Sequence, residues 1–221
     1  MTTTDSTFDA GSGVRPRGSE CEPRLDAVFD ALAGGECRDL LDCLAETEDA
    51  LSVETLAARL PGDDDRVRAR LHHTGLPKLA DAGLIAYDAD RELVRSGSDA
   101  EVEAVRAAVA DADPPVDFDV LFALLSNARR RHALRRLLAH GDLSLPDLAD
   151  EVAVAERGRP LPDIDPDAVL DVYLSLYHTH VPKLAGAGLA TYDQDGDFVT
   201  ATDAGRELES TVRELCEAVR A

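Results

Sequence analysis

Lysine, tryptophan and cysteine are scarce in this chain of 221 residues, which has no tryptophan and only two lysines, Lys78 and Lys183. The four cysteines form no C-x-x-C pair and have no spacing that is typical of metal ligands. Thiols without such a pattern indicate a reduced compartment rather than a disulfide framework. We therefore expect no metal site and no other bound cofactor.

Long apolar runs are missing as well. No segment of the sequence approaches the roughly 18 consecutive apolar residues that a membrane-spanning helix requires. The N-terminus also lacks the charged and then apolar pattern of a secretory signal. These absences predict a soluble, cytoplasmic protein with no membrane partner.

Motifs of catalysis are absent from the sequence too. It contains no glycine-rich phosphate loop, no nucleophile elbow and no pair of carboxylates in an apolar setting that would raise a pKa. We therefore expect that the protein is not an enzyme.

Acidic residues dominate the charge, because 44 aspartates and glutamates oppose 23 basic residues and give a formal net charge of −21. A carboxylate-rich surface keeps a protein soluble when molar salt screens charges beyond about 3 Å. The composition therefore predicts a salt-loving source. Acidity ordinarily disfavours DNA, whose affinity comes largely from phosphate neutralisation. Since molar salt already suppresses that attraction, a local surface that is not acidic would be enough for a DNA-binding protein.

The sequence repeats itself. The segment from Leu71, LHHTGLPKLADAGLIAYDADRELV, matches the segment from Leu176, LYHTHVPKLAGAGLATYDQDGDFV. Upstream, ALSVETLAARL around Ser52 matches DLSLPDLADEV around Ser144. Equivalent residues lie 92 positions apart at Ser52 and Ser144 but 105 positions apart at Leu71 and Leu176, because the second copy carries 13 extra residues between these points. Repeats of this length indicate a duplicated domain.

The domain boundaries follow from this repeat and from composition. Residues 1–23 are rich in Thr, Ser, Gly and Asp and have no apolar period, so we expect a disordered tail. We expect a first domain over 24–110, a linker over 111–117, and a second domain with a C-terminal helix over 118–221.

Local patterns predict the same element order in both copies. In the second copy, leucines at helical spacing predict a first helix or helix pair, and Ser144 and Asp165 are typical N-caps of two further helices. Pro182 lies inside the third helix and is expected to kink its axis. After Gly188, two strand-like pieces around the turn Asp193–Asp197 predict a β-hairpin. The fold class is therefore mainly α with small β-hairpin wings, as two tandem winged helix-turn-helix domains.

The segments LLSNARRRHALRRLLAHGDLSLPDLADEV and HTHVPKLAGAGLATYD resemble winged helix-turn-helix proteins of the arsenic-repressor (ArsR) type. They are closer still to the tandem winged-helix regulators of haloarchaea. The resemblance covers roughly residues 26–96 and 118–200. It implies a DNA-binding transcriptional regulator with double-stranded DNA as its partner, usually acting as a dimer.

Candidate DNA-contacting residues are placed by position within this resemblance. The exposed first part of the recognition helix corresponds to Tyr177, His178, Thr179 and His180. His and Thr can donate to and accept from base edges, and Lys183 can pair with a phosphate. Lys183 and its counterpart Lys78 could equally serve as charges at a helix end.

The densest basic cluster of the chain consists of Arg129, Arg130, Arg131, Arg135 and Arg136. It could contact the DNA backbone, or it could pair with carboxylates inside the protein. The first copy has GGECRDLLD in its place. We therefore expect a degenerate first domain and a second domain that is the principal DNA reader.

Two questions about the partners of the protein stay open at this point. The apolar face of the C-terminal helix is a candidate for homodimerisation. Alternatively, the winged helices form a protein-interaction adaptor without DNA binding. The adaptor interpretation gains if carboxylates such as Asp165, Asp167 and Asp171 fill the surface between the arginine cluster and the recognition helix.

Overall fold

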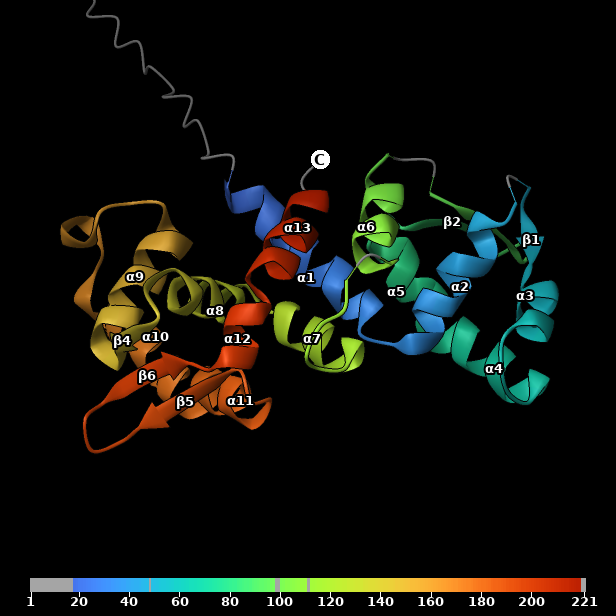
Figure 1. The fold of residues 1–221 in the computed structure, drawn as a ribbon. Helices are drawn as coiled ribbons and strands as arrows, with labels where there is room; N and C mark the ends of the chain where they lie inside the picture. The colour runs from blue at the N-terminus through green and yellow to red at the C-terminus, as the bar shows by residue number, and fades with distance from the viewer. Residues whose placement is uncertain (1–17, 48, 98–99, 111, 220–221) are drawn as a thin grey trace, which may run out of the picture.

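The computed structural model describes residues 18–47, 49–97, 100–110 and 112–219. The chain is mainly helical with two small three-stranded antiparallel sheets, which confirms the expected mainly α class with small β elements (Figure 1). Most of the expected tail lies outside the described residues, but helix α1 begins at Gly18, inside the segment that was predicted to be disordered. No helix in the described part of the chain is long and apolar enough to cross a membrane.

The first half contains six α-helices, one π-helical turn and three strands within its described ranges. They are α1 (Gly18–Leu32), α2 (Gly35–Ala45), β1 (Leu51–Ser52), α3 (Val53–Arg59), α4 (Asp64–Arg70), the π-turn η1 (Leu71–Gly75), α5 (Leu76–Asp81), β2 (Ile85–Asp88), β3 (Leu93–Ser96) and α6 (Ala100–Ala110).

The second half repeats this order after residues 111–117, the segment expected to be a linker. Its elements are α7 (Phe118–Leu125), α8 (Ala128–His140), β4 (Asp142–Ser144), α9 (Leu145–Arg157), the 3₁₀ turn η2 (Leu161–Asp163), α10 (Pro166–Ser175), the π-turn η3 (Leu176–His180), α11 (Val181–Gly186), β5 (Ala190–Asp193), β6 (Phe198–Ala201), α12 (Asp203–Glu207) and α13 (Glu209–Ala218).

Each half has a sheet with the same strand order, β1-β3-β2 in the first and β4-β6-β5 in the second. The hairpins pair in equivalent registers, with Tyr87 opposite Val94 and Tyr192 opposite Val199. The expected hairpins are therefore confirmed. The sequence did not predict β1 and β4, the short strands that precede α3 and α9 and complete the two sheets.

Side-chain caps fix where the helices begin. Ser52 accepts a hydrogen bond from the backbone N–H of Thr55, and Ser144 accepts one from Asp147 in the second half. Asp165 accepts from the N–H of Asp167 at the start of α10. Such caps satisfy backbone donors that have no partner within the helix, so the helix starts predicted at Ser144 and Asp165 are confirmed.

In each half, two α-helices and the π-turn between them form one continuous helix, α4–η1–α5 in the first half and α10–η3–α11 in the second. This continuous helix is the expected third helix, and its proline follows the π-turn. The N–H of Leu76 donates to the carbonyl of Leu71, five residues earlier, and Val181 donates to Leu176 in the same way. Pro182 then lies in the first turn of α11, where it needs no N–H donor. A widened turn therefore directly precedes the segment that carries the proline in each copy. We name the two continuous helices the first-half third helix (64–81) and the second-half third helix (166–186).

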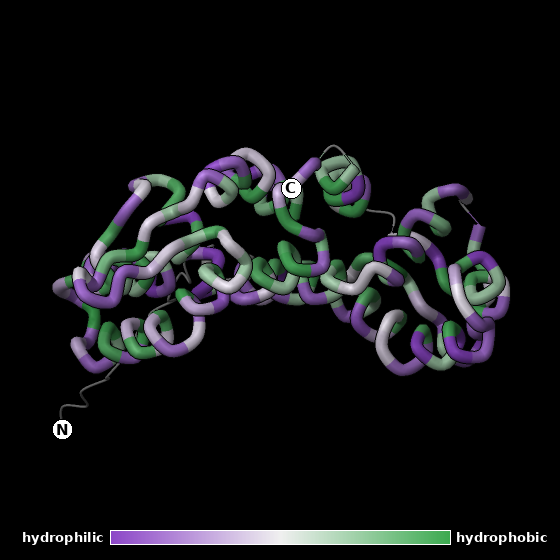
Figure 2. The backbone as a smooth tube through the Cα atoms, turned by 60° about the horizontal axis from the view of Figure 1, so that its bottom comes forward, coloured by the Kyte–Doolittle hydropathy of each residue, from purple (hydrophilic) through white to green (hydrophobic). Residues whose placement is uncertain are grey.

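Helices from both halves form the middle of the elongated molecule. Helix α1 packs on α7, and α6 packs on α13, so equivalent elements meet each other (Figure 1). Apolar residues run through these central helices and alternate there with hydrophilic ones (Figure 2). The halves therefore form a pseudo-symmetric pair within one chain.

The homodimer expected through the C-terminal helix needs correction. The apolar side chains that were to mediate it, Leu208, Val212, Leu215 and Val219, are at most 2% exposed within a single chain. Helix α13 packs instead on α6 of the other half. Since the apolar face is already covered, it is not available to a second copy.

A reciprocal contact of arginine, carboxylate and phenylalanine holds the halves together. Arg131 pairs with Asp26 of the other half, and its guanidinium lies over the ring of Phe29. Arg38 pairs with Asp119 of the second half at 2.7 Å. This is the equivalent pair in the other direction, because Arg38 lies 93 positions before Arg131 and Asp119 lies 93 positions after Asp26.

The two phenylalanines of this contact meet at its centre. The rings of Phe29 and Phe122 stack with their centroids 6.1 Å apart, and the guanidinium of Arg38 lies over Phe122. Both arginines also donate to the last carbonyl of the preceding helix, Arg38 to Leu32 and Arg131 to Leu125. The same interactions therefore occur twice, once from each half.

Arg131→Ala is expected to lower the free energy of unfolding by about 3 kcal/mol, because it leaves the partly buried carboxylates of Glu22 and Asp26 and the buried carbonyl of Leu125 without this donor. Arg38→Ala should cost about 1 kcal/mol, since its ion pair is more exposed. Urea denaturation followed by circular dichroism measures both effects. Arg135→Ala, an exposed arginine on the same helix α8, is the matched control. An equal, small effect of Arg131→Ala and Arg135→Ala would contradict the role of this contact.

Candidate functional site

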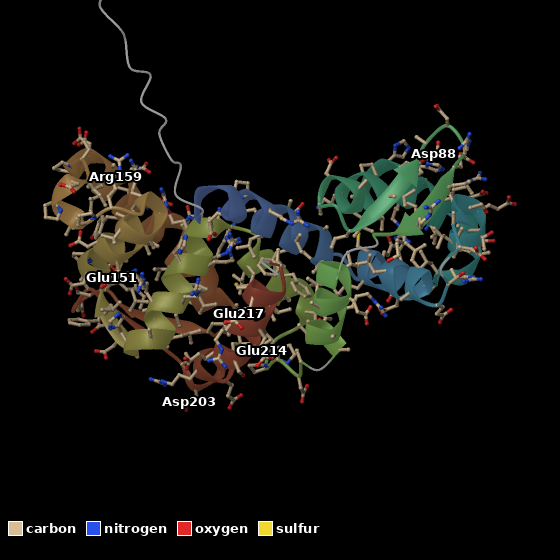
Figure 3. All side chains as sticks on the ribbon, turned by 90° about the horizontal axis from the view of Figure 1, so that it is seen from above. Asp88, Glu151, Arg159, Asp203, Glu214 and Glu217 are labelled. Atoms are coloured by element: carbon tan, nitrogen blue, oxygen red, sulfur yellow. The ribbon has the colours of Figure 1, made fainter. Side chains whose placement is uncertain are left out.

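The third helix and the hairpin of each half form two comparable surfaces. Asp88, at the end of β2, lies at one end of the molecule, and Arg159, after α9, lies at the opposite end (Figure 3). Helices α4 and α10, the first parts of the two third helices, also lie at opposite ends (Figure 1), so the two surfaces belong to separate ends of one chain.

The arginine cluster predicted to contact DNA is largely directed inward. Arg130 is 5% exposed and donates to the carbonyls of Leu124 and Ala123 at the end of α7. Burial lowers the pKa of its guanidinium. Arg131 is 2% exposed and pairs with Glu22 and Asp26.

The remaining arginines of the cluster differ in their surroundings. Arg129 is paired with Glu156 at 2.6 Å and with Asp171 at 3.2 Å, and its hydrogen bond to Glu156 raises its pKa. Arg136 lies 3.4 Å from Glu151, and Arg135 is exposed. The expected backbone contact by Arg129, Arg130 and Arg131 is thus corrected, because carboxylates and carbonyls of the protein already take up their donors.

The recognition-helix residues divide into exposed and buried ones. Tyr177, His178, Thr179 and Lys183 are exposed on the second-half third helix. His180 is only 7% exposed, and its Nδ1 has no hydrogen-bond partner within the described structure. The prediction that His180 reads a base edge is therefore wrong in this conformation, since the ring faces the interior of the protein.

Carboxylates and apolar side chains occupy much of the second-half surface. Asp165, Asp167 and Asp171 are exposed around α10. Leu170 and Leu174, on the same helix, are 53% and 44% exposed. The surface next to the arginine cluster is thus acidic and apolar, which is the arrangement that favours the adaptor interpretation.

The first-half third helix presents a different surface on the same framework. Arg66, Arg68 and Arg70 are exposed there, at positions that correspond to Asp171, Tyr173 and Ser175. The arginine run of the second copy gives no hint of these arginines, because that run lies on α8 and not on the third helix. The signal that could have found them lies in the alignment of the two copies. Residues 66–70 read RVRAR where residues 171–175 read DVYLS.

Two of these three arginines form ion pairs, and both pairs lie on the surface. Arg68 lies 3.5 Å from Asp65, with both side chains more than half exposed, and Arg70 pairs with Glu36. Arg66 has no ion pair within the described residues. Surface pairs of this kind contribute little energy and exchange readily for another anion.

The charges of the two surfaces differ clearly. Helix and hairpin of the first half (64–81 and 85–96) carry six acidic and six basic residues. The corresponding elements of the second half (166–186 and 190–201) carry five acidic residues and one basic residue, Lys183. On a chain of net charge −21, the first-half surface is therefore the less repulsive one for an anion.

The two lysines also differ. Lys78 is half-buried and pairs with Asp30 at 2.8 Å, so it serves the packing of the first half. Lys183 is exposed and has no ion pair within the described residues. Among those residues, no group of three or more His, Cys, Asp or Glu side chains could hold a metal ion.

The comparisons with known proteins give a family and no further relative. A family model described as a domain of unknown function (DUF7344) matches residues 29–95 and again residues 122–200. These two matches coincide with the duplicated halves of the fold. No curated protein and no solved structure matches the chain.

His180 is expected to make stability depend on pH. Burial, followed by the charges of Arg130, Arg129 and Lys183, lowers its pKa from 6.5 to about 4. The unfolded chain binds a proton at His180 below pH 6.5, whereas the folded chain does so only near pH 4. The free energy of unfolding should therefore fall by about 3 kcal/mol as the pH is lowered through this window.

Urea denaturation between pH 7 and pH 4 checks this expectation with His180→Gln, which should flatten the pH dependence relative to the native protein. His178→Gln, an exposed neighbour, should leave the pH dependence unchanged. The same slope in the native protein and in His180→Gln would show that the burial of His180 does not control it.

Proposed function

Since the chain belongs to the DUF7344 family and contains its domain twice, we propose that it is a transcriptional regulator that binds double-stranded DNA through tandem winged helix-turn-helix domains. One observation carries the proposal. Both halves have the order of helix, strand, helix, helix and hairpin, and the first strand pairs with the second strand of the hairpin. That order and pairing are typical of a winged helix.

The first half is the proposed DNA-contacting half. Its third helix exposes Arg66, Arg68 and Arg70, and Arg91 is exposed in the turn of its hairpin. Arginine donors of this kind pair with phosphates and with guanine edges. This assignment reverses the expectation that the second domain is the principal reader, because that expectation depended on arginines that lie inside the protein.

The pairing of the halves supports action as a single chain. Dimeric helix-turn-helix proteins use two protomers to present two equivalent elements to DNA. Here the equivalent elements are joined through α1, α7, α6 and α13 of one chain. A single chain therefore pairs two such domains as a dimer pairs two protomers, but only one of its two third helices is suited by charge to DNA.

Protein binding is a second candidate function, and one observation favours it. The second-half third helix exposes Leu170, Leu174 and Tyr177, flanked by carboxylates, instead of arginines. The two functions are compatible because they use separate ends of the molecule.

Binding to sheared genomic DNA from the native host tests the proposed function. Purified protein selects fragments from this pool, and sequencing identifies the enriched ones. Arg66→Ala/Arg68→Ala should reduce affinity for an enriched duplex at least tenfold, because two contacts to DNA are lost. It should also reduce the slope of log K against log salt by about 2 if both contact phosphates.

Arg157→Ala/Arg159→Ala is the matched control, because it removes the same charge from exposed sites in the second half. It should leave affinity nearly unchanged. No enrichment by the native protein would overturn DNA binding, and an equal loss in both variants would overturn the assignment to the first half.

A further inference from the structure

An apolar stripe lies exposed on the second-half third helix. Leu170, Leu174 and Tyr177 are 53%, 44% and 38% exposed, and they follow one another at intervals of four and three residues. Side chains at this spacing lie on one face of a helix. Only three other large apolar residues are comparably exposed in the described part of the chain.

Aromatic contacts hold one end of this stripe in place. The ring of Tyr177 stacks on Tyr173 with centroids 6.4 Å apart and meets Tyr192 of the hairpin edge-on at 6.0 Å. His178 contacts the same ring at 4.8 Å. Tyr177 is therefore a positioned side chain on the surface, a property common in residues that anchor binding partners.

The fold itself does not require an apolar stripe here. In the first half, the positions equivalent to Leu170, Leu174 and Tyr177 are Asp65, Ala69 and His72. Both halves still form the same helix with the same π-turn. The duplicated helix therefore forms with an aspartate and an alanine in place of the two leucines.

Carboxylates border the stripe. Asp163, Asp165, Asp167 and Asp171 are exposed on α10 and on the turn before it, whereas Lys183 is the single basic residue of the helix. Asp171 already pairs with Arg129 at 3.2 Å, whereas Asp163, Asp165 and Asp167, at the start of α10, have no ion pair within the described residues. Carboxylates beside an apolar stripe complement a partner with the same apolar spacing and basic flanks. They also oppose DNA, whose phosphates would face these carboxylates.

We propose that the stripe of Leu170, Leu174 and Tyr177 is a docking site for a basic amphipathic helix of a partner protein. A helix that offers apolar side chains at the same spacing packs along the stripe, and its arginines or lysines pair with the bordering aspartates. This site rests on the geometry of the second half alone and does not depend on the DNA-binding role of the first half.

A labelled designed peptide tests the proposal. The peptide is a helix with leucines at intervals of four and three residues and arginines on both sides, and its matched analogue carries glutamates in place of the arginines. Fluorescence anisotropy with the full chain should give saturable binding of the basic peptide and at least tenfold weaker binding of the acidic one. Leu170→Ser/Leu174→Ser should weaken the basic peptide at least tenfold.

Val120→Ser is the control, because it removes an exposed apolar residue on α7 (41% exposed) and should not change binding. Circular dichroism verifies that each variant keeps its helices. The DNA selection described above, repeated with Leu170→Ser/Leu174→Ser, should be unaffected, so the docking site and the DNA-binding role can fail separately.

Four outcomes would overturn the docking site: no saturable binding of the basic peptide, equal binding of the acidic analogue, unchanged binding to Leu170→Ser/Leu174→Ser, or loss of DNA selection in that variant. Sedimentation velocity adds a fifth. A native dimer that Leu170→Ser/Leu174→Ser dissociates would identify a second copy of the chain as the occupant.

Discussion

The reciprocal contact between arginine, carboxylate and phenylalanine is the interaction on which the rest of the structure depends. Arg131 and Arg38 each reach across to the other half, and the rings of Phe29 and Phe122 stack between them. An arginine buried this deeply would destabilise the protein without its partners. Because the contact occurs once in each direction, it fixes how the halves face each other. It also places the two third helices at separate ends of the molecule.

Much of this fold could be predicted from the sequence, because helix caps, apolar periods and the duplicated segments are local signals. The candidate site could not, because the burial of an arginine depends on which helix packs against it. The run at Arg129 suggested a basic surface, although carboxylates far away in the sequence neutralise it. One usable signal was overlooked: the spacing of Asp26, Phe29 and Arg38 recurs in the second half, 93 residues later. A recurrent arginine and aspartate of opposite charge could have marked these positions as candidates for a reciprocal contact.

One framework thus carries two chemically different surfaces. The first-half third helix exposes Arg66, Arg68 and Arg70, whereas the second-half third helix exposes two leucines, a tyrosine and aspartates. Duplication followed by divergence of exposed positions produces this result, because those positions are not constrained by the core. In the proposed account, one end of the chain binds DNA and the other binds a protein helix. The rigid pairing of the halves would then couple the two partners in space.

Hydrogen–deuterium exchange with and without an enriched DNA duplex tests the central claim most directly. The account predicts slower exchange on DNA addition in residues 64–81 of the first half, with residues 166–186 of the second half unchanged. Slower exchange in 166–186 with none in 64–81 would contradict it, because DNA would then bind the acidic surface and not the arginine-bearing one.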